Sequence, residues 1–134
     1  MNLRLVLLLS TIALVAAIAT VYVIPPAAES GCWVAVILTC ALAVARLAPG
    51  KFFFHGFLVG LLNWLWVAAS HVLLFSAFAA RHPHDLTGMQ SVAGLPGWMR
   101  QYGIPIPGAS GVLIGALAWL LSRVPALRKR PAEA

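Results

Sequence analysis

Charged residues are scarce in this sequence, and their scarcity excludes a large water-facing surface. Among 134 residues, Lys and Arg account for 9 and Asp and Glu for 3, so 9% of the chain is charged. Soluble domains contain about 25% charged residues. Because 62% of the residues are hydrophobic, we predict that the lipid bilayer is the solvent of this chain. The length predicts one membrane domain over residues 1–134.

Carboxylates are absent from the apolar runs, and this argues against a proton-coupled pump. Glu29, Asp85 and Glu133 all fall outside the predicted spans. Proton-coupled transporters generally use a titratable group inside the membrane, and the small four-helix multidrug exporters carry an embedded Glu. The sequence also lacks a nucleophile elbow, an H-E-x-x-H motif and a phosphate-binding glycine loop. We therefore predict no enzymatic activity, no catalytic residue and no cofactor.

Cysteine is represented by Cys32 and Cys40 alone. On one predicted helix, these two residues lie about 12 Å apart at 1.5 Å per residue. That separation is too long for an intrachain disulfide. Both cysteines are therefore predicted to be small packing residues.

Four long apolar runs dominate the rest of the chain. They cover approximately 4–24, 31–48, 52–80 and 108–124, and a long connection covers 81–107. A helix of about 20 apolar residues crosses a bilayer, and the first run is longer than the apolar core of a signal peptide. Short connections between the first three runs favour antiparallel neighbours. The predicted fold is all-α, an antiparallel bundle of four membrane-spanning helices.

Lysine and arginine are unevenly distributed between the two predicted sides of the membrane. The side with both termini holds Arg4, Arg46, Lys51, Arg123, Arg128, Lys129 and Arg130. The opposite side holds Arg81 and Arg100. Cytoplasmic segments of membrane proteins carry the excess of positive residues. This asymmetry therefore predicts cytoplasmic termini and an outer 81–107 loop. The net charge of +6 does not indicate a nucleic-acid partner, because the basic residues lie at the ends of the apolar runs.

Small residues form stripes at helical spacing on the third and fourth runs. The third run carries Gly56, Gly60, Asn63, Val67, Ser70, Leu74 and Ala77 on one seam. The fourth carries Gly108, Gly111, Gly115, Ala118 and Ser122. In lipid, small residues mark the faces on which helices approach one another closely. We predict that Gly56, Gly60, Gly111 and Gly115 serve helix packing.

The third run also contains a candidate intramembrane polar cluster of His55, Asn63, Ser70 and His71. On a helical wheel these residues share one broad side. One interpretation is that Asn63 hydrogen-bonds a neighbouring helix and holds the helices together. The other is that the polar side lines a pathway or a ligand pocket. Both interpretations remain open from the sequence.

Histidines raise the questions of haem and metal binding. His55 and His71 differ by about 160° around the third helix, so they cannot be axial ligands of two stacked haems on one face. His82, His84 and Asp85 are residue types that bind zinc or copper. No fourth partner is evident near them, and a hydrated loop that ends a helix explains the motif. We predict no metal site and leave these three residues open.

Several short motifs resemble a family of small four-helix bacterial inner-membrane proteins of unknown function. They are Lys51-Phe-Phe-Phe-His55-Gly56, Asn63 and a following tryptophan, Ser70-His71-x-Leu-Leu-Phe75, His82-Pro83 and Gly111-Val-Leu-Ile-Gly115. The resemblance covers residues 50–120. It implies a bacterial inner-membrane location and attention to His55, Asn63 and His71, and it implies no activity.

These observations predict a small multi-pass integral membrane protein with a structural or accessory role exerted through helix packing. Its expected partners are the lipid bilayer and a second copy of the chain or another membrane protein. The alternative is a small transporter or channel subunit in which the polar side of the third helix lines a pathway.

Overall fold

The computed structural model describes residues 1–81 and 105–127, and within these ranges the chain is helical and contains no strand. The helices are α1 (Leu3–Tyr22), α2 (Pro26–Leu47), α3 (Phe52–Leu73), α4 (Phe75–Arg81) and α7 (Pro105–Leu121), followed by a 3₁₀ turn (Pro125–Leu127). The first three are long and apolar enough to cross a membrane. At 17 residues, α7 is shorter, about 25 Å at 1.5 Å per residue.

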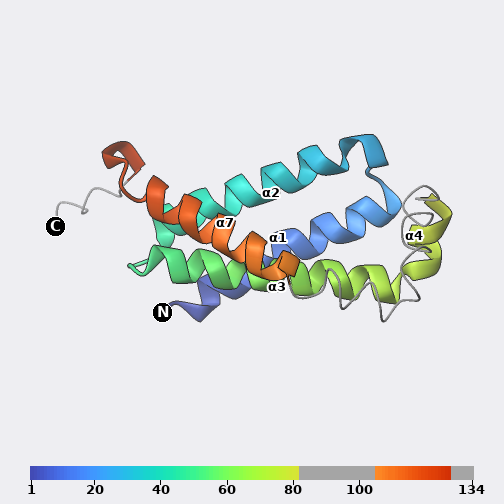
Figure 1. The fold of residues 1–134 in the computed structure, drawn as a ribbon, viewed down its shortest axis with the longest axis horizontal. Coiled ribbons are helices and arrows are strands. Elements are labelled where there is room, and N and C mark those ends of the chain that lie inside the picture. The colour runs from blue at the N-terminus through green and yellow to red at the C-terminus, as the bar shows by residue number, and fades with distance from the viewer. Residues whose placement is uncertain (82–104, 128–134) are drawn as a thin grey trace.

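The long helices lie side by side and alternate in direction (Figure 1). α1 starts at the end of the molecule where the N-terminus lies, α2 returns to it, α3 leaves again and α7 comes back. α7 packs mainly on α3 and also contacts α2, while α1 packs on α3 and α2. Because α7 starts beside the middle of α3, it accompanies only the half of α3 nearer that end (Figure 1).

The start of α1 has a side-chain cap, Asn2. Asn2 has an extended backbone, and its Oδ1 accepts a hydrogen bond from the Leu5 amide at 3.1 Å. Asn is among the residue types preferred at this position because its side chain satisfies an amide that has no partner within the helix. The helix ends at Tyr22, shortly before the two prolines of the connection.

The second helix begins at Pro26, earlier than the expected start near residue 31. Proline at a first helical position costs no hydrogen bond, because that amide has no partner inside the helix, and its fixed φ suits the helix. Ser30 and Gly31 therefore lie inside α2. Glu29 joins the first turn, where its negative charge complements the helix dipole.

The third apolar run is broken at Leu74, so the expected continuous helix over 52–80 is wrong. Leu74 ends α3 with φ −108° and ψ 24°, and α4 follows. Phe78 is buried, and its ring centroid lies 4.5 Å from that of His71. The break brings α4 back onto α3 and α1, so burial of Phe78 offsets the interrupted helix.

The turn between α2 and α3 is tight and uses left-handed backbone. Gly50 has φ +153°, and Lys51 adopts φ 48° and ψ 43°. A non-glycine residue in the left-handed region costs free energy because its Cβ approaches the carbonyl oxygen. This conformation reverses the chain within four residues, 48–51, and starts α3 beside α2.

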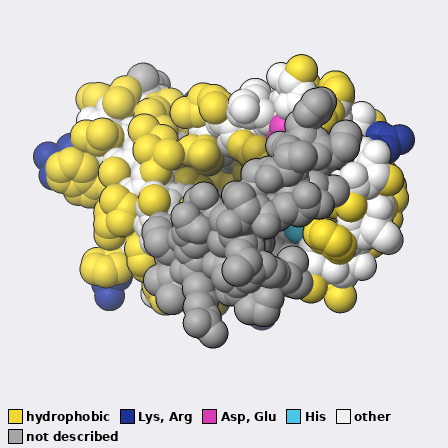
Figure 2. Space-filling model, turned by 45° about the vertical axis from the view of Figure 1, so that its right-hand side comes forward, with side chains coloured by type: hydrophobic (Ala, Val, Ile, Leu, Met, Phe, Trp, Pro, Cys, Tyr) yellow, Lys and Arg dark blue, Asp and Glu magenta, His cyan; other side chains and the backbone are white. Residues whose placement is uncertain are grey.

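Many interior side chains are small, while many large apolar side chains point outward. The fully buried residues include Ala13, Ala17, Val44, Val59 and Ala118. By contrast, Leu8, Val23 and Leu73 are 66–82% exposed. Figure 2 shows hydrophobic side chains over much of the visible face, with Lys and Arg at the ends. An apolar exterior around a small-residue interior is typical of a protein surrounded by lipid.

Candidate functional site

The closest helix contact joins the glycines of α3 and α7. A Cβ placed on Gly60 would lie 2.5 Å from the Gly111 Cα, and one on Gly56 would lie 2.8 Å from the Gly115 Cα. Real Cβ atoms do not approach backbone atoms this closely, so only glycine fits both positions. The two backbones are therefore in direct contact along two successive turns, and the four glycines predicted for helix packing lie at one interface.

Phe53 and Phe57 on α3 complete this interface. A Cβ on Gly111 would lie 2.9 Å from the Phe57 carbonyl oxygen, and one on Gly115 would lie 2.7 Å from the Phe53 carbonyl oxygen. The two phenyl rings stack with centroids 6.2 Å apart, and their edges reach the same glycines. The glycines on α7 thus pack against both the backbone and the aromatic side chains of α3.

Ser110 adds a hydrogen bond at the start of this interface. Its Oγ donates to the carbonyl oxygens of Gly60 and Pro107, each at 3.2 Å. The bond to Gly60 crosses between α7 and α3 next to the closest glycine contact. It fixes the position at which α7 begins relative to α3.

His55 joins the beginnings of α1 and α3. It is 1% exposed. Its Nε2 accepts from the Asn2 backbone amide at 2.9 Å, and its Nδ1 lies 3.1 Å from the Lys51 carbonyl oxygen. Since Nε2 accepts, Nδ1 carries the proton and donates to Lys51. Both ring nitrogens are therefore used in holding the N-terminus of the chain on α3.

Asn63 lies between α2 and α3 at mid-helix and is 7% exposed. Its Nδ2 contacts the Cys40 Sγ at 3.8 Å, and that sulfur lies 3.8 Å from the Leu9 carbonyl oxygen. This chain of weak contacts connects α3, α2 and α1. The Asn63 Oδ1 is buried and has no hydrogen-bond partner among the described residues. Such an atom costs about 1–3 kcal/mol compared with a satisfied one.

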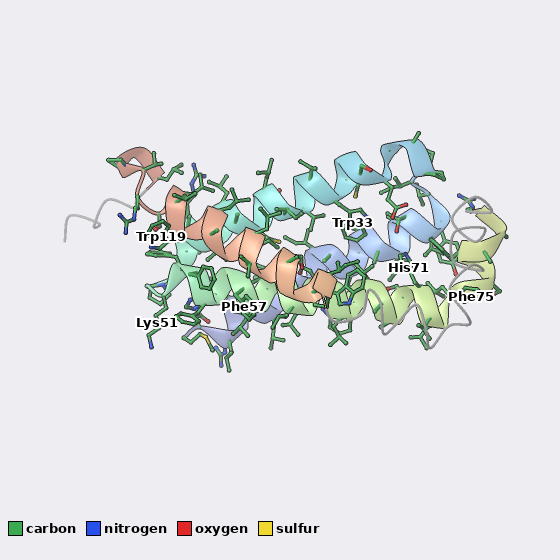
Figure 3. The ribbon with its side chains drawn as sticks, viewed as in Figure 1. Trp33, Lys51, Phe57, His71, Phe75 and Trp119 are labelled. Atoms are coloured by element: carbon green, nitrogen blue, oxygen red, sulfur yellow. The ribbon has the colours of Figure 1, made fainter. Side chains whose placement is uncertain are left out.

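Ser70 and His71 lie at the far end of α3, about 24 Å along the helix from His55 at 1.5 Å per residue. Ser70 is buried and His71 is partly buried. Figure 3 shows His71 in the half of the molecule away from Lys51. The structure therefore separates His55 from the other predicted polar residues, and it places Asn63 and His71 together along one cavity.

The cavity has a volume of about 370 Å³ and lies between α2 and α3, beside the start of α7. α2 contributes Glu29, Trp33 and Ile37 to its wall, and α3 contributes Asn63, Trp64, Val67 and His71. Phe78 of α4 closes one side, and Ile106, Ser110 and Ile114 of α7 form another. Sites for small molecules have volumes of about 300–1,000 Å³ and mostly apolar walls with a few polar groups, so this cavity is at the lower end of that range.

Glu29 is a member of the cavity wall that the sequence interpretation placed outside the second span. Because α2 starts at Pro26, Glu29 belongs to the helix, and it accepts a hydrogen bond from the Trp33 Nε1 at 3.1 Å. The spacing of four residues puts both side chains on one helix face. The sequence signal for this placement was the proline at the first helical position.

Two further polar contacts could not be inferred from local sequence. Trp66 donates from Nε1 to the Ser10 Oγ at 3.1 Å, which links α3 to α1. The Asn2–His55 bond joins residues 53 positions apart. Both contacts depend on the register between helices, which small-residue stripes do not determine.

Metal-ligating residues do not gather in the part of the chain that the structure describes, where no three His, Cys, Asp or Glu side chains come together. Cys32 and Cys40 are both free thiols. His82, His84 and Asp85, which the sequence left open as metal ligands, lie outside the described residues.

Known proteins provide no further assignment, and the resemblance over residues 50–120 stays a prediction. Comparisons of this chain with protein families, with curated proteins and with solved structures find no match.

Proposed function

We propose that this chain is a small multi-pass integral membrane protein with four spanning helices and a structural or accessory role exerted through helix packing. The observation that carries the proposal is the glycine contact between α7 and α3. Three helices are long and apolar enough to span a membrane. A fourth apolar helix in backbone contact with one of them is expected to share its environment.

The orientation follows from the charged ends of the helices. Arg4, Arg46, Lys51 and Arg123 belong to the helix ends nearest the N-terminus, while Arg81 ends α4 at the opposite end (Figure 1). The positive-inside rule then favours cytoplasmic termini. The sequence resemblance would place the protein in a bacterial inner membrane. A non-enzymatic role is part of the proposal, because the sequence lacks a nucleophile elbow, an H-E-x-x-H motif and a phosphate-binding glycine loop.

Reporter fusions test the four-span arrangement. A reporter that is active only in the cytoplasm is expected to work at both the N-terminus and the C-terminus of the full chain. The same reporter fused after Arg81 is expected to be inactive, because three crossings precede that point. Activity at only one terminus of the full chain would contradict four spans.

A transporter or channel subunit is the second candidate function, and the cavity favours it because Asn63 and His71 both line the wall. The interior beyond Asn63 opposes it, since Val44, Val59 and Ile114 are buried there. Reconstituted liposomes test this candidate through solute flux. A flux that disappears with Asn63→Leu would support a pathway, and impermeable liposomes would exclude one.

A further inference from the structure

We propose that one end of the helix bundle binds an anionic phospholipid of the surrounding bilayer, with the lipid phosphate held between Arg123 and Lys51. This basic end is formed by Arg4, Arg46, Lys51 and Arg123. The site presupposes the membrane location proposed above and is independent of the packing role.

The four cations come from four different helix ends that the fold brings to one end of the molecule. Arg4 lies in the first turn of α1, Arg46 in the last turn of α2, Lys51 directly before α3 and Arg123 shortly after α7. All four are exposed. The remaining cation among the described residues, Arg81, ends α4 at the opposite end (Figure 1). The positive charge is therefore concentrated on one surface.

Carboxylates of the chain itself do not balance this charge. Glu29, the acidic residue in the described part of the chain, lies in the first turn of α2, about 26 Å along the helix from Arg46 at 1.5 Å per residue. Asp85 and Glu133, which lie outside that part, are fewer than the four cations. The basic end therefore attracts a negative partner, and basic clusters beside membrane-spanning helices attract anionic lipid headgroups.

Arg123 is held where a lipid phosphate lies. Its Cζ lies 4.0 Å from the centroid of the Trp119 ring, and Trp119 is exposed. Tryptophan is typical of the boundary between bilayer and water. A guanidinium group stacked on an aromatic face keeps the donors at its edge available, and these donors match a phosphate group in a bidentate manner. Trp119 thus presents Arg123 for phosphate binding at headgroup depth.

Lys51 lies beside this position because of the register between α3 and α7. The glycine contacts pair Gly60 with Gly111 and, one turn further along both helices, Gly56 with Gly115. The next turn places Phe52, the first residue of α3, level with Trp119. Figure 3 shows Lys51 and Trp119 at the same end of the molecule. Lys51 and Arg123 therefore supply positive charge from two neighbouring helix ends.

The exposed face of α7 continues from Arg123 toward the middle of the bundle and is apolar. Its exposed side chains include Val112, Leu113, Trp119 and Leu120. The spacing of seven residues places these pairs on one face of the helix, the same face as Arg123. An acyl chain lying along α7 would contact this face while its phosphate remains at Arg123. A phospholipid therefore matches both the charge and the apolar surface.

Native mass spectrometry of the full-length protein tests the proposal. Protein in neutral detergent micelles receives equal amounts of phosphatidylglycerol and phosphatidylcholine with identical acyl chains. Phosphatidylglycerol is expected to be bound in about 25-fold excess, because each of two cations near an anionic headgroup contributes a factor of about five. Inorganic phosphate at the concentration of the lipid is expected not to displace it. Displacement by phosphate, or equal binding of the two lipids, would overturn the proposal.

Charge variants locate the site. Arg123→Gln and Lys51→Gln are each expected to lower the lipid preference about fivefold, and Arg123→Lys is expected to retain it. Arg81→Gln, which removes an exposed cation at the opposite end, is the matched control and should leave the preference unchanged. A preference that neither Arg123→Gln nor Lys51→Gln lowers would overturn the proposal, as would an equal loss in Arg81→Gln.

Failure of this site is distinguishable from failure of the proposed membrane arrangement. Micelles leave both ends of the molecule accessible to added lipid, so the result does not depend on orientation. The reporter fusions test the spans without reference to lipid type. Thermal unfolding of each variant confirms that it is folded, as expected for substitutions of exposed side chains.

Discussion

Replacing Gly60 with alanine is expected to lower the free energy of unfolding by about 2–3 kcal/mol, the cost typical of overpacking. The added methyl group would lie 2.5 Å from the Gly111 Cα and 2.7 Å from the Gly111 nitrogen. Backbone atoms of a helix cannot move aside as a flexible side chain does, so α7 must shift away from α3. Reversible unfolding in detergent micelles measures the loss.

Gly108→Ala is the matched control. Gly108 lies on α7, the helix that packs against Gly60, and no atom outside its own stretch of helix lies within 4 Å of a Cβ placed there. Alanine is the better helix former, so this variant is expected to be neutral or more stable by up to about 1 kcal/mol. Equal stability losses at Gly60 and Gly108 would show that helix propensity, and not the α3–α7 contact, determines the effect.

Replacing His55 with leucine is expected to lower the free energy of unfolding by about 2 kcal/mol, because two hydrogen bonds contribute about 1 kcal/mol each. The Asn2 amide would lose its acceptor, while the Lys51 carbonyl oxygen would keep the backbone bond from the His55 amide at 3.1 Å. The substitution should therefore weaken the attachment of the start of α1 to α3 more than it weakens the start of α3 itself.

Conservative variants and spectroscopy make this prediction specific. His55→Gln offers an acceptor near the former Nε2, so it should retain more stability than His55→Leu. Nitrogen NMR of the imidazole should find the proton on Nδ1 in the folded protein, as the two hydrogen bonds require. A proton on Nε2, or equal stability of the wild type and His55→Leu, would contradict this role.

The sequence predicts the helical class well because long apolar runs carry a direct physical signal. It predicts element ends less well. The predicted start near residue 31 is too late because proline suits the first turn of a helix, so α2 already begins at Pro26. No glycine or proline lies at the break at Leu74, so the sequence contains no local signal that the helix ends there. It depends on the burial of Phe78 against His71, a tertiary contact that no local pattern contains.

The candidate site, too, could be predicted only in part from the sequence. The glycine stripes indicated the faces of close approach, but they did not specify which glycine meets which. The polar side of α3 was visible on a helical wheel, yet His55 is bound by Asn2 and Lys51 while Asn63 and His71 line the cavity. A helical wheel shows the angle of each residue around the helix but not how far apart the residues lie along its axis. The cavity itself depends on where α7 begins, and no spacing within the sequence determines that point.

The central claim is that α7 packs on α3 through glycine backbones within the membrane. The most direct test is solid-state NMR of the protein in lipid bilayers with ¹³C at glycine Cα only, since the chain contains 11 glycines. The account predicts Cα–Cα cross-peaks between Gly60 and Gly111 and between Gly56 and Gly115. Absence of both cross-peaks, from a sample in which all four glycines have helical chemical shifts, would contradict it.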